Sequence, residues 1–183
     1  MNIRLAGFGG QGIVMAGYVL GRAGLLDGRN ALQTQSYGSE SRGGASKSDV
    51  IISSEQILDL LPTALDVLVA MSQPALDTYV ASLKPEGILI YDSGLAQPSD
   101  GGVRAVGVPA TAVAEKTFGR DVVANVIVLG CLVGVTGVVS HEALCQAVSK
   151  SVPPKTVEMN LRALEEGIKL GLERKERLGE PGA

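Results

Sequence analysis

The chain has 183 residues, 45% of them hydrophobic, and a formal net charge of −3 at pH 7. This length suits one domain with its own core. The acidic balance argues against a nucleic-acid surface, and two Phe, four Tyr and no Trp leave few side chains for stacking bases. No apolar stretch is predicted to cross a membrane, and the N-terminus shows no basic leader. We therefore expect a cytoplasmic protein without nucleic-acid or membrane partners.

The chain opens with a predicted strand at residues 3–6 that leads into Gly7, Gly9 and Gly12. This G-x-G-x-x-G spacing is typical of a strand, tight turn and helix whose N-terminus binds phosphate. We expect Gly7 to permit the turn, Gly9 to let a ligand approach the backbone, and Gly12 to let helix 11–26 pack closely on the strand. The alternative is that the glycines serve helix packing alone.

The next predicted strand, residues 30–35, argues against a dinucleotide cofactor. A dinucleotide-binding fold has an acidic residue there to hold the ribose, or a basic one for NADP. The strand contains neither, since Arg29 precedes it and the next carboxylate, Glu40, lies in the following loop. We therefore do not expect a bound nicotinamide or flavin dinucleotide.

The rest of the chain continues to alternate strands and helices. Strands are predicted at 47–53, 67–70, 87–91 and 103–106, and helices at 74–83, 111–116, 122–139, 140–150 and 154–174. This order predicts an α/β fold, a three-layer Rossmann-like arrangement with a mostly parallel sheet, helices on both faces and a helical C-terminal part. We expect residues 1–178 to form a single α/β domain and residues 179–183 to be a frayed tail.

The thiols and the single histidine do not suggest a catalytic centre. Cys131 and Cys145 are fourteen residues apart within apolar helical patterns, so we expect buried thiols rather than cluster or zinc ligands. His141 follows Ser140 at a predicted helix start and is expected on the surface. The tail helix should be a solvated face with pairs such as Glu165 and Lys169. No catalytic residue and no metal site are predicted for this chain.

The polar segment 36–46 is a second candidate site. In a parallel sheet, the loops that follow the first two strands open at the same edge. Arg42, flanked by Ser41 and Gly43, offers a guanidinium on a bare backbone, which suits a phosphate group. The alternative is a hydrophilic loop in which Arg42 pairs with Glu40.

Asn125 is a lone amide near the start of the apolar helix predicted at 122–139. It is either a group that hydrogen-bonds a ligand or a helix cap near residues 119–121. The sequence leaves both readings open.

These segments resemble the gamma subunit of 2-oxoacid:ferredoxin oxidoreductases, and the similarity covers most of the chain. It rests on Gly-Phe-Gly-Gly-Gln-Gly-Ile at 7–13, on Ser-Tyr-Gly-Ser-Glu-Ser-Arg-Gly-Gly-Ala-Ser at 36–46, and on residues 47–53, 66–72, 87–93 and 125–130. The loop is most similar to the 2-oxoglutarate branch, with the pyruvate, 2-oxoisovalerate and indolepyruvate branches as alternatives. Ser39 stands where the family usually has Pro, which should change loop stiffness more than chemistry.

The resemblance implies a subunit of a complex that oxidatively decarboxylates a 2-oxoacid to acyl-CoA and reduces ferredoxin. Thiamine diphosphate and iron–sulfur clusters would belong to alpha and beta subunits and any ferredoxin-like delta subunit, and the isolated chain would be inactive. This chain would help to bind coenzyme A, with amides of Gly12 and Ile13, a phosphate contact from Arg42 and a hydrogen bond from Asn125. The full set implied for coenzyme A is Gly9, Gly10, Gln11, Gly12, Ile13, Ser41, Arg42, Gly43 and Asn125.

The apolar helices after Val122 are expected to supply the surface that meets the partner subunits. Two alternatives remain at this point. One is a stand-alone nucleotide-binding protein, and the other is a subunit whose glycine turn binds only partner backbone.

Overall fold

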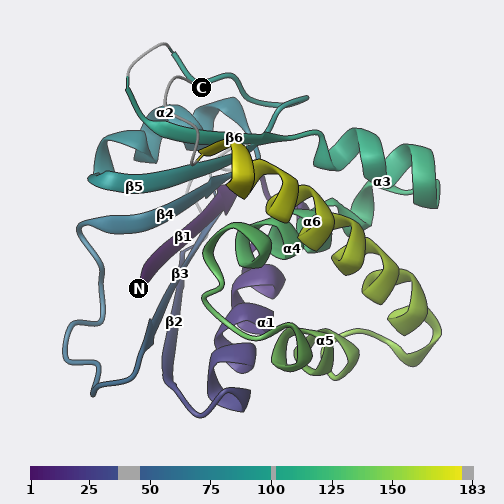
Figure 1. Ribbon diagram of the computed structural model, residues 1–183, viewed down its shortest axis with the longest axis horizontal. Helices are drawn as coiled ribbons and strands as arrows, with labels where there is room; N and C mark the ends of the chain where they lie inside the picture. Colours follow the sequence, from purple (N-terminus) through teal and green to yellow (C-terminus); the bar gives the residue numbers. More distant parts are fainter. Residues whose placement is uncertain (37–45, 100–101, 179–183) are drawn as a thin grey trace.

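The computed structural model describes residues 1–36, 46–99 and 102–178, and Figure 1 shows their arrangement. A six-stranded sheet forms its centre, with strand order β2-β3-β1-β4-β5-β6. The strands are β1 (Asn2–Gly7), β2 (Asn30–Ser36), β3 (Ser46–Ser53), β4 (Leu65–Ala70), β5 (Leu83–Asp92) and β6 (Arg104–Val108). The predicted strands are therefore confirmed, with ends that differ by a few residues.

The sheet is parallel except at β3, which runs antiparallel to both of its neighbours, β1 and β2. Two antiparallel steps leave β2 parallel to β1, so both strands end at the same edge. Gly7 at the end of β1 pairs with Ser46, and Ser36 at the end of β2 pairs with Lys47. Ser36 and Ser46, which flank the segment 37–45, thus lie at the same edge of the sheet as the glycine turn, as the sequence predicts.

The helices also follow the predicted order. They are α1 (Ile13–Leu26), α2 (Gln73–Tyr79), α3 (Ala110–Phe118), α4 (Ala124–Thr136), α5 (His141–Ser149) and α6 (Val157–Leu178), with 3-10 turns η1 (Val80–Ser82), η2 (Asp121–Val123) and η3 (Pro154–Thr156). The helix predicted at 74–83 is shorter, because α2 gives way to the 3-10 turn η1 after Tyr79. No helix of the described residues is long and apolar enough to cross a membrane.

The two faces of the sheet are covered unequally. Helices α1, α4, α5 and α6 lie on one side and enclose the main core, whereas α2 covers part of the other (Figure 1). The side chains of β1 alternate between the two faces, and this contributes to the unequal covering. Ile3 points into the main core and Arg4 toward the other face. There Arg4 forms a buried ion pair with Asp49, 2.5 Å between Nε and Oδ1, and lies over the ring of Tyr79.

Helix α4 is the most deeply buried helix, because every residue from Ala124 to Val135 is buried. The sequence prediction of a buried helix here is confirmed. The expectation that the helices after Val122 present an apolar surface to partners is wrong for α4, since its residues 124–135 are buried within this chain. Exposed apolar side chains occur elsewhere, including Leu58 and Leu61 between β3 and β4.

Helices α4 and α6 touch through four glycines. A Cβ added at Gly167 would overlap the carbonyl oxygen of Ile127, and one at Gly134 would lie 2.6 Å from the carbonyl oxygen of Ile168. The other two members of this set, which we call the glycine seam, are Gly130 and Gly171. The two backbones therefore pack at a separation that no larger residue allows.

Candidate functional site

The glycine turn, residues 7–12, joins β1 to α1. Gly10 and Gly12 have φ values of +93° and +73°, the left-handed region that favours glycine. Gly7 does not adopt this conformation, and it permits the turn through its small size. A Cβ at Gly7 would overlap Oε1 of Gln11 and lie 3.1 Å from Cβ of Met71, so glycine is needed there for space.

Gln11 holds the turn together from within. Its Oε1 accepts a hydrogen bond from the amide of Phe8 at 2.7 Å, and its Nε2 donates to the carbonyl of Met71 at 2.9 Å. This side chain therefore ties the turn to the end of β4. The sequence grouped Gln11 with ligand-binding residues, and the structure shows its amide engaged with the backbone.

The N-terminus of α1 offers free hydrogen-bond donors. Gly12 is its N-cap residue, and no side chain caps the helix. The amides of Gly12 and Ile13 meet no acceptor among the residues that the structure describes. Unpaired N–H groups and the positive end of the helix dipole together favour an anion.

Asn125 lies across from this helix end, in the first turn of α4. Its Nδ2 donates to the carbonyl oxygen of Gly12 at 3.2 Å, while its Oδ1 is buried and has no partner among the described residues. The reading of Asn125 as a helix cap is wrong, because α4 begins after Val123 and the amide reaches a different helix. A Cβ at Gly12 would overlap Nδ2 of Asn125, so the two residues fit only as a pair.

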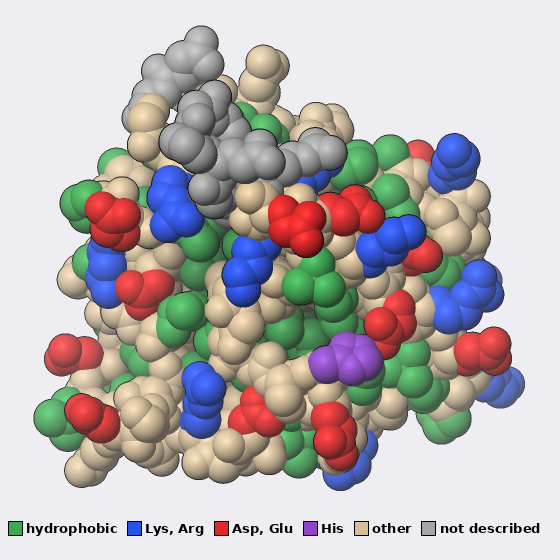
Figure 2. Space-filling model, in the orientation of Figure 1, with side chains coloured by type: hydrophobic (Ala, Val, Ile, Leu, Met, Phe, Trp, Pro, Cys, Tyr) green, Lys and Arg blue, Asp and Glu red, His purple; other side chains and the backbone are tan. Residues whose placement is uncertain are grey.

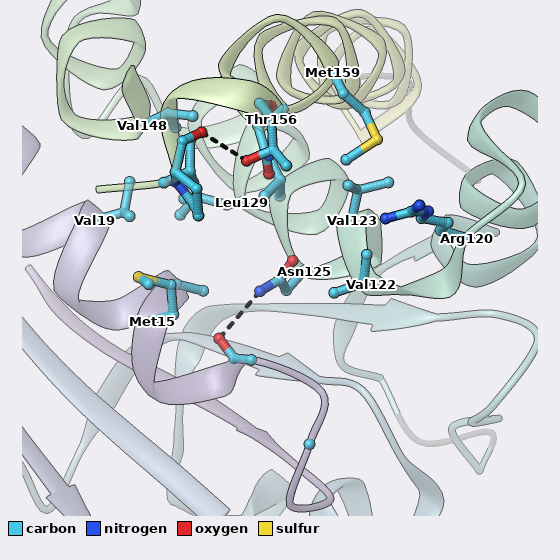
Figure 3. A pocket seen from close by; sticks show the side chains of 17 residues that line it. Met15, Val19, Arg120, Val122, Val123, Asn125, Leu129, Val148, Thr156 and Met159 are labelled. Carbon is cyan, nitrogen blue, oxygen red and sulfur yellow. Dashed lines mark hydrogen bonds between the residues drawn. The ribbon is translucent and has the colours of Figure 1, made fainter. Parts of the chain in front are cut away.

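A cavity of about 390 Å³ opens beside Asn125, among α1, α4, α5 and α6. Figure 3 shows the Asn125 amide directed toward it from below and the Arg120 side chain at its rim. Most of its wall is apolar and includes Met15, Val19, Leu129, Val148 and Met159. A polar amide at the base of an apolar cavity is typical of a ligand site with one or two orienting hydrogen bonds.

A second hollow, of about 490 Å³, lies on the other side of the turn and shares Gly10 and Val122 with the first. Its wall includes Gly9, Thr111 and Asp121. The glycine turn thus separates an apolar cavity from a more polar one at the carboxyl edge of the sheet. This edge is where ligands bind in open α/β sheets.

The structure therefore brings Gly9, Gly10, Gly12, Ile13 and Asn125 together. The predicted ligand residues Ser41, Arg42 and Gly43 lie outside the described residues. The sequence analysis missed Arg120 and the apolar wall, because η2 and α6 approach the turn only in the folded chain.

The two thiols have different surroundings. Cys131 is buried, and this burial raises the pKa of its thiol to about 12. Cys145 is partly exposed, so its predicted burial is wrong. Burial and the nearby Glu165 carboxylate raise the pKa of the Cys145 thiol above its ordinary value. Neither thiol is thus activated as a nucleophile.

His141 is the first residue of α5 and is exposed, as predicted. Glu165 pairs with it, 2.5 Å between Oε1 and Nε2. The predicted pair of Glu165 with Lys169 is not among the ion pairs of the described residues.

Comparison with known proteins identifies the relatives of this chain. Residues 2–170 match the family model described as pyruvate ferredoxin/flavodoxin oxidoreductase. The chain is 45% identical over 180 residues to the 2-oxoglutarate synthase subunit KorC of Methanothermobacter marburgensis, covering 94% of this chain and 97% of the relative. It is 43% identical over 176 residues to KorC of Methanocaldococcus jannaschii, covering 94% of each.

Solved structures agree with this assignment. The gamma subunit of the keto/oxoacid ferredoxin oxidoreductase of Geobacter sulfurreducens is similar with a TM-score of 0.84 and 42% identity, over 94% of this chain and 98% of that one. The 2-oxoglutarate:ferredoxin oxidoreductase of Magnetococcus marinus, solved with 2-oxoglutarate, coenzyme A and succinyl-CoA, is similar with a TM-score of 0.84 and 25% identity, over 94% of this chain and 31% of that one. The resemblance seen in the sequence is confirmed, and the chain belongs to the pyruvate ferredoxin/flavodoxin oxidoreductase family.

Proposed function

We propose that this chain is the gamma subunit of a cytoplasmic 2-oxoglutarate:ferredoxin oxidoreductase and that its glycine turn helps to bind coenzyme A. Thiamine diphosphate and the iron–sulfur clusters would reside on alpha and beta subunits and any ferredoxin-like delta subunit. Ferredoxin would accept the electrons of the assembled enzyme. The high identity to KorC subunits over almost their full length supports the choice of the 2-oxoglutarate branch.

One observation carries the assignment of the site. The Oδ1 atom of Asn125 is buried without a partner among the described residues, and it lies beside the free N-terminal amides of α1. A buried acceptor without a donor is unfavourable by about 1–3 kcal/mol, so a ligand that donates to it gains affinity. Coenzyme A carries both phosphates and amide N–H donors, which match the helix end and the Asn125 oxygen respectively.

The residues of this chain would bind and orient, and none would transfer a proton. The amides of Gly12 and Ile13 would hold a phosphate, and Gly10, with nothing within 4 Å of an added Cβ, leaves room for it to approach. Arg42 would add a charged contact, as the resemblance implies, and Arg120 stands at the rim of the cavity. Coenzyme A supplies the thiol that accepts the acyl group. Fixing the rest of the molecule gives that thiol proximity and orientation.

Kinetics of the assembled complex test this proposal. Arg42→Ala should raise the KM for coenzyme A about 10- to 100-fold with little change in kcat, because a charge-assisted hydrogen bond contributes roughly 1.5–3 kcal/mol. Asn125→Ala should raise it about 3- to 10-fold, as expected for a neutral hydrogen bond. The KM for 2-oxoglutarate should stay unchanged in both variants.

Arg22→Ala is the matched control. Arg22 lies near the other end of α1, where its guanidinium donates to the carbonyl of Lys150. The Arg22→Ala variant should leave the KM for coenzyme A and kcat unchanged. An unchanged KM for coenzyme A in both Arg42→Ala and Asn125→Ala would contradict the proposal and favour a glycine turn that binds only partner backbone.

A further inference from the structure

Three potential metal ligands meet on the surface between α5 and α6. His141 and Cys145 are four residues apart on α5 and so share one face of the helix, and Glu165 faces them from α6. The Sγ atom of Cys145 lies 3.5 Å from Nε2 of His141 and 3.8 Å from Oε1 of Glu165. Figure 2 shows the histidine, the purple group, open to solvent.

These distances are close to those of a tetrahedral zinc site. Zinc binds sulfur at about 2.3 Å and nitrogen or oxygen at about 2.0–2.2 Å, so neighbouring ligand atoms in a tetrahedron lie about 3.4–3.6 Å apart. The 3.5 Å distance from Cys145 to His141 matches this spacing, and the 3.8 Å distance from Cys145 to Glu165 is about 0.2 Å longer. The largest adjustment concerns the 2.5 Å hydrogen bond between His141 and Glu165, which would have to lengthen by about 1 Å.

The ligands stand on helices that are fixed independently of any metal. Ser140 caps α5 by accepting from the amide of Ala143, and its own amide and hydroxyl both donate to the carboxylate of Asp27 at the end of α1. Glu165 is two residues from Gly167 of the glycine seam, which locks α6 against α4. Ligand positions set by rigid elements favour a site that needs little rearrangement.

We propose that His141, Cys145 and Glu165 form a zinc site with one open coordination position. A thiolate and a carboxylate neutralise the two charges of Zn²⁺, and imidazole completes a set of ligand types that zinc prefers. The arrangement is poorly explained as a simple ion pair. Exposed ion pairs contribute little to stability, so the contact between His141 and Glu165 does not by itself account for the thiol of Cys145 beside it.

The site would join α5 and α6, two of the four helices that line the apolar cavity. Val148 of α5 and Met159 of α6 both line that cavity, and the three ligands connect the same helices. Bound zinc would therefore restrain the cavity wall without touching its contents. This inference does not depend on the proposed coenzyme A function.

Cobalt substitution of the full-length chain tests the site, because the chain provides a built-in control. Under reducing, chelator-free conditions, Co²⁺ should bind one-to-one and give a thiolate-to-cobalt charge-transfer band, and Zn²⁺ should displace it. Cys145→Ser should abolish the band, whereas Cys131→Ala, which removes the buried thiol, should keep it. His141→Ala and Glu165→Gln should each weaken Zn²⁺ binding at least about 10-fold, the lower limit for loss of even an outer-shell partner.

Thermal unfolding gives a second measurement that does not depend on the charge-transfer band. Zn²⁺ should raise the Tm of the wild-type chain and of Cys131→Ala by mass action, and should leave that of Cys145→Ser unchanged. Circular dichroism without metal checks that each variant is folded. Absence of the band in the folded wild-type chain, or a band of equal strength in Cys145→Ser, would overturn the proposal.

Discussion

In the glycine turn and the glycine seam, the absence of a side chain on glycine has opposite consequences. In the turn, Gly10 and Gly12 adopt left-handed φ values and line a cavity. In the seam, glycines such as Gly130 and Gly167 have ordinary helical φ values, and opposing backbone carbonyls fill the space of the absent Cβ. Glycine thus permits a left-handed turn beside a cavity in one region and the close packing of two helix backbones in the other.

The difference predicts how each region responds to alanine. In the seam the added methyl group collides with backbone, which cannot move without displacing a whole helix. In the turn, alanine at Gly12 is disfavoured mainly by the left-handed backbone conformation. It is also disfavoured by contact with the end of the Asn125 side chain. Alanine should therefore affect stability most in the seam and ligand binding most in the turn.

Gly167→Ala should have the largest effect. Its Cβ would overlap the carbonyl of Ile127, so we expect a loss of about 3 kcal/mol or more in the free energy of unfolding, the upper range for overpacking. Urea unfolding of the full chain measures this. Gly21→Ala in α1 is the matched control, because its Cβ would meet only Val50 at 3.9 Å and should stabilise by about 0.5–1 kcal/mol. Equal effects at the two positions would show that α4 and α6 are not in backbone contact.

Gly12→Ala should come next, with a loss of about 2–3 kcal/mol. The left-handed conformation accounts for about 1–2 kcal/mol of this, and displacement of the Asn125 amide accounts for the rest. Gly28 isolates the first contribution, because it has the same φ of +73° and no atom within 4 Å of an added Cβ. The unfolding free energy of Gly28→Ala should fall by about 1–2 kcal/mol only. If the two variants lost the same amount, the contact between Gly12 and Asn125 would contribute nothing.

The smallest effect concerns Cys131, whose backbone carbonyl lies against Gly171 of the seam. Burial raises the pKa of its thiol from 9.0 to about 12, so the folded state keeps a proton that the unfolded state loses. Stability from this group is complete below pH 9 and declines as the pH rises toward 12. Between pH 8 and pH 10 the wild-type chain should lose roughly 1 kcal/mol more than Cys131→Ala, measured by urea unfolding at both values. An equal loss in both chains would mean that water reaches this thiol through the seam.

Much of the fold could be predicted from the sequence, because strands and helices alternate with clear local patterns. The glycine spacing at 7–12 predicted the turn and the free helix end correctly. The reversed direction of β3 could not be read locally, since it depends on how the chain returns after residue 36. The shared edge was nevertheless predicted correctly, because two reversals restore the direction of β2.

The site itself was less predictable. Asn125 stood out as a lone amide, but its partner, the carbonyl of Gly12, lies 113 residues earlier in the chain. Arg120 carries no local motif that would connect it with a cavity. The four-residue spacings of Gly130 with Gly134 and of Gly167 with Gly171 are visible in the sequence, yet only the packed helices show that these two pairs face each other.

The way in which α1 is held has a consequence for the order of events during synthesis. Its beginning is fixed by the hydrogen bond from Asn125 to Gly12, and its end by the bonds from Ser140 to Asp27, each across 113 residues. Contacts of such long sequence separation close late, because the intervening chain must first be made and ordered. The glycine turn, which is synthesised before Asn125 and Ser140, is therefore among the last parts to be completed, and in a nascent chain that has not reached Ser140 the end of α1 lacks its hydrogen-bond partner.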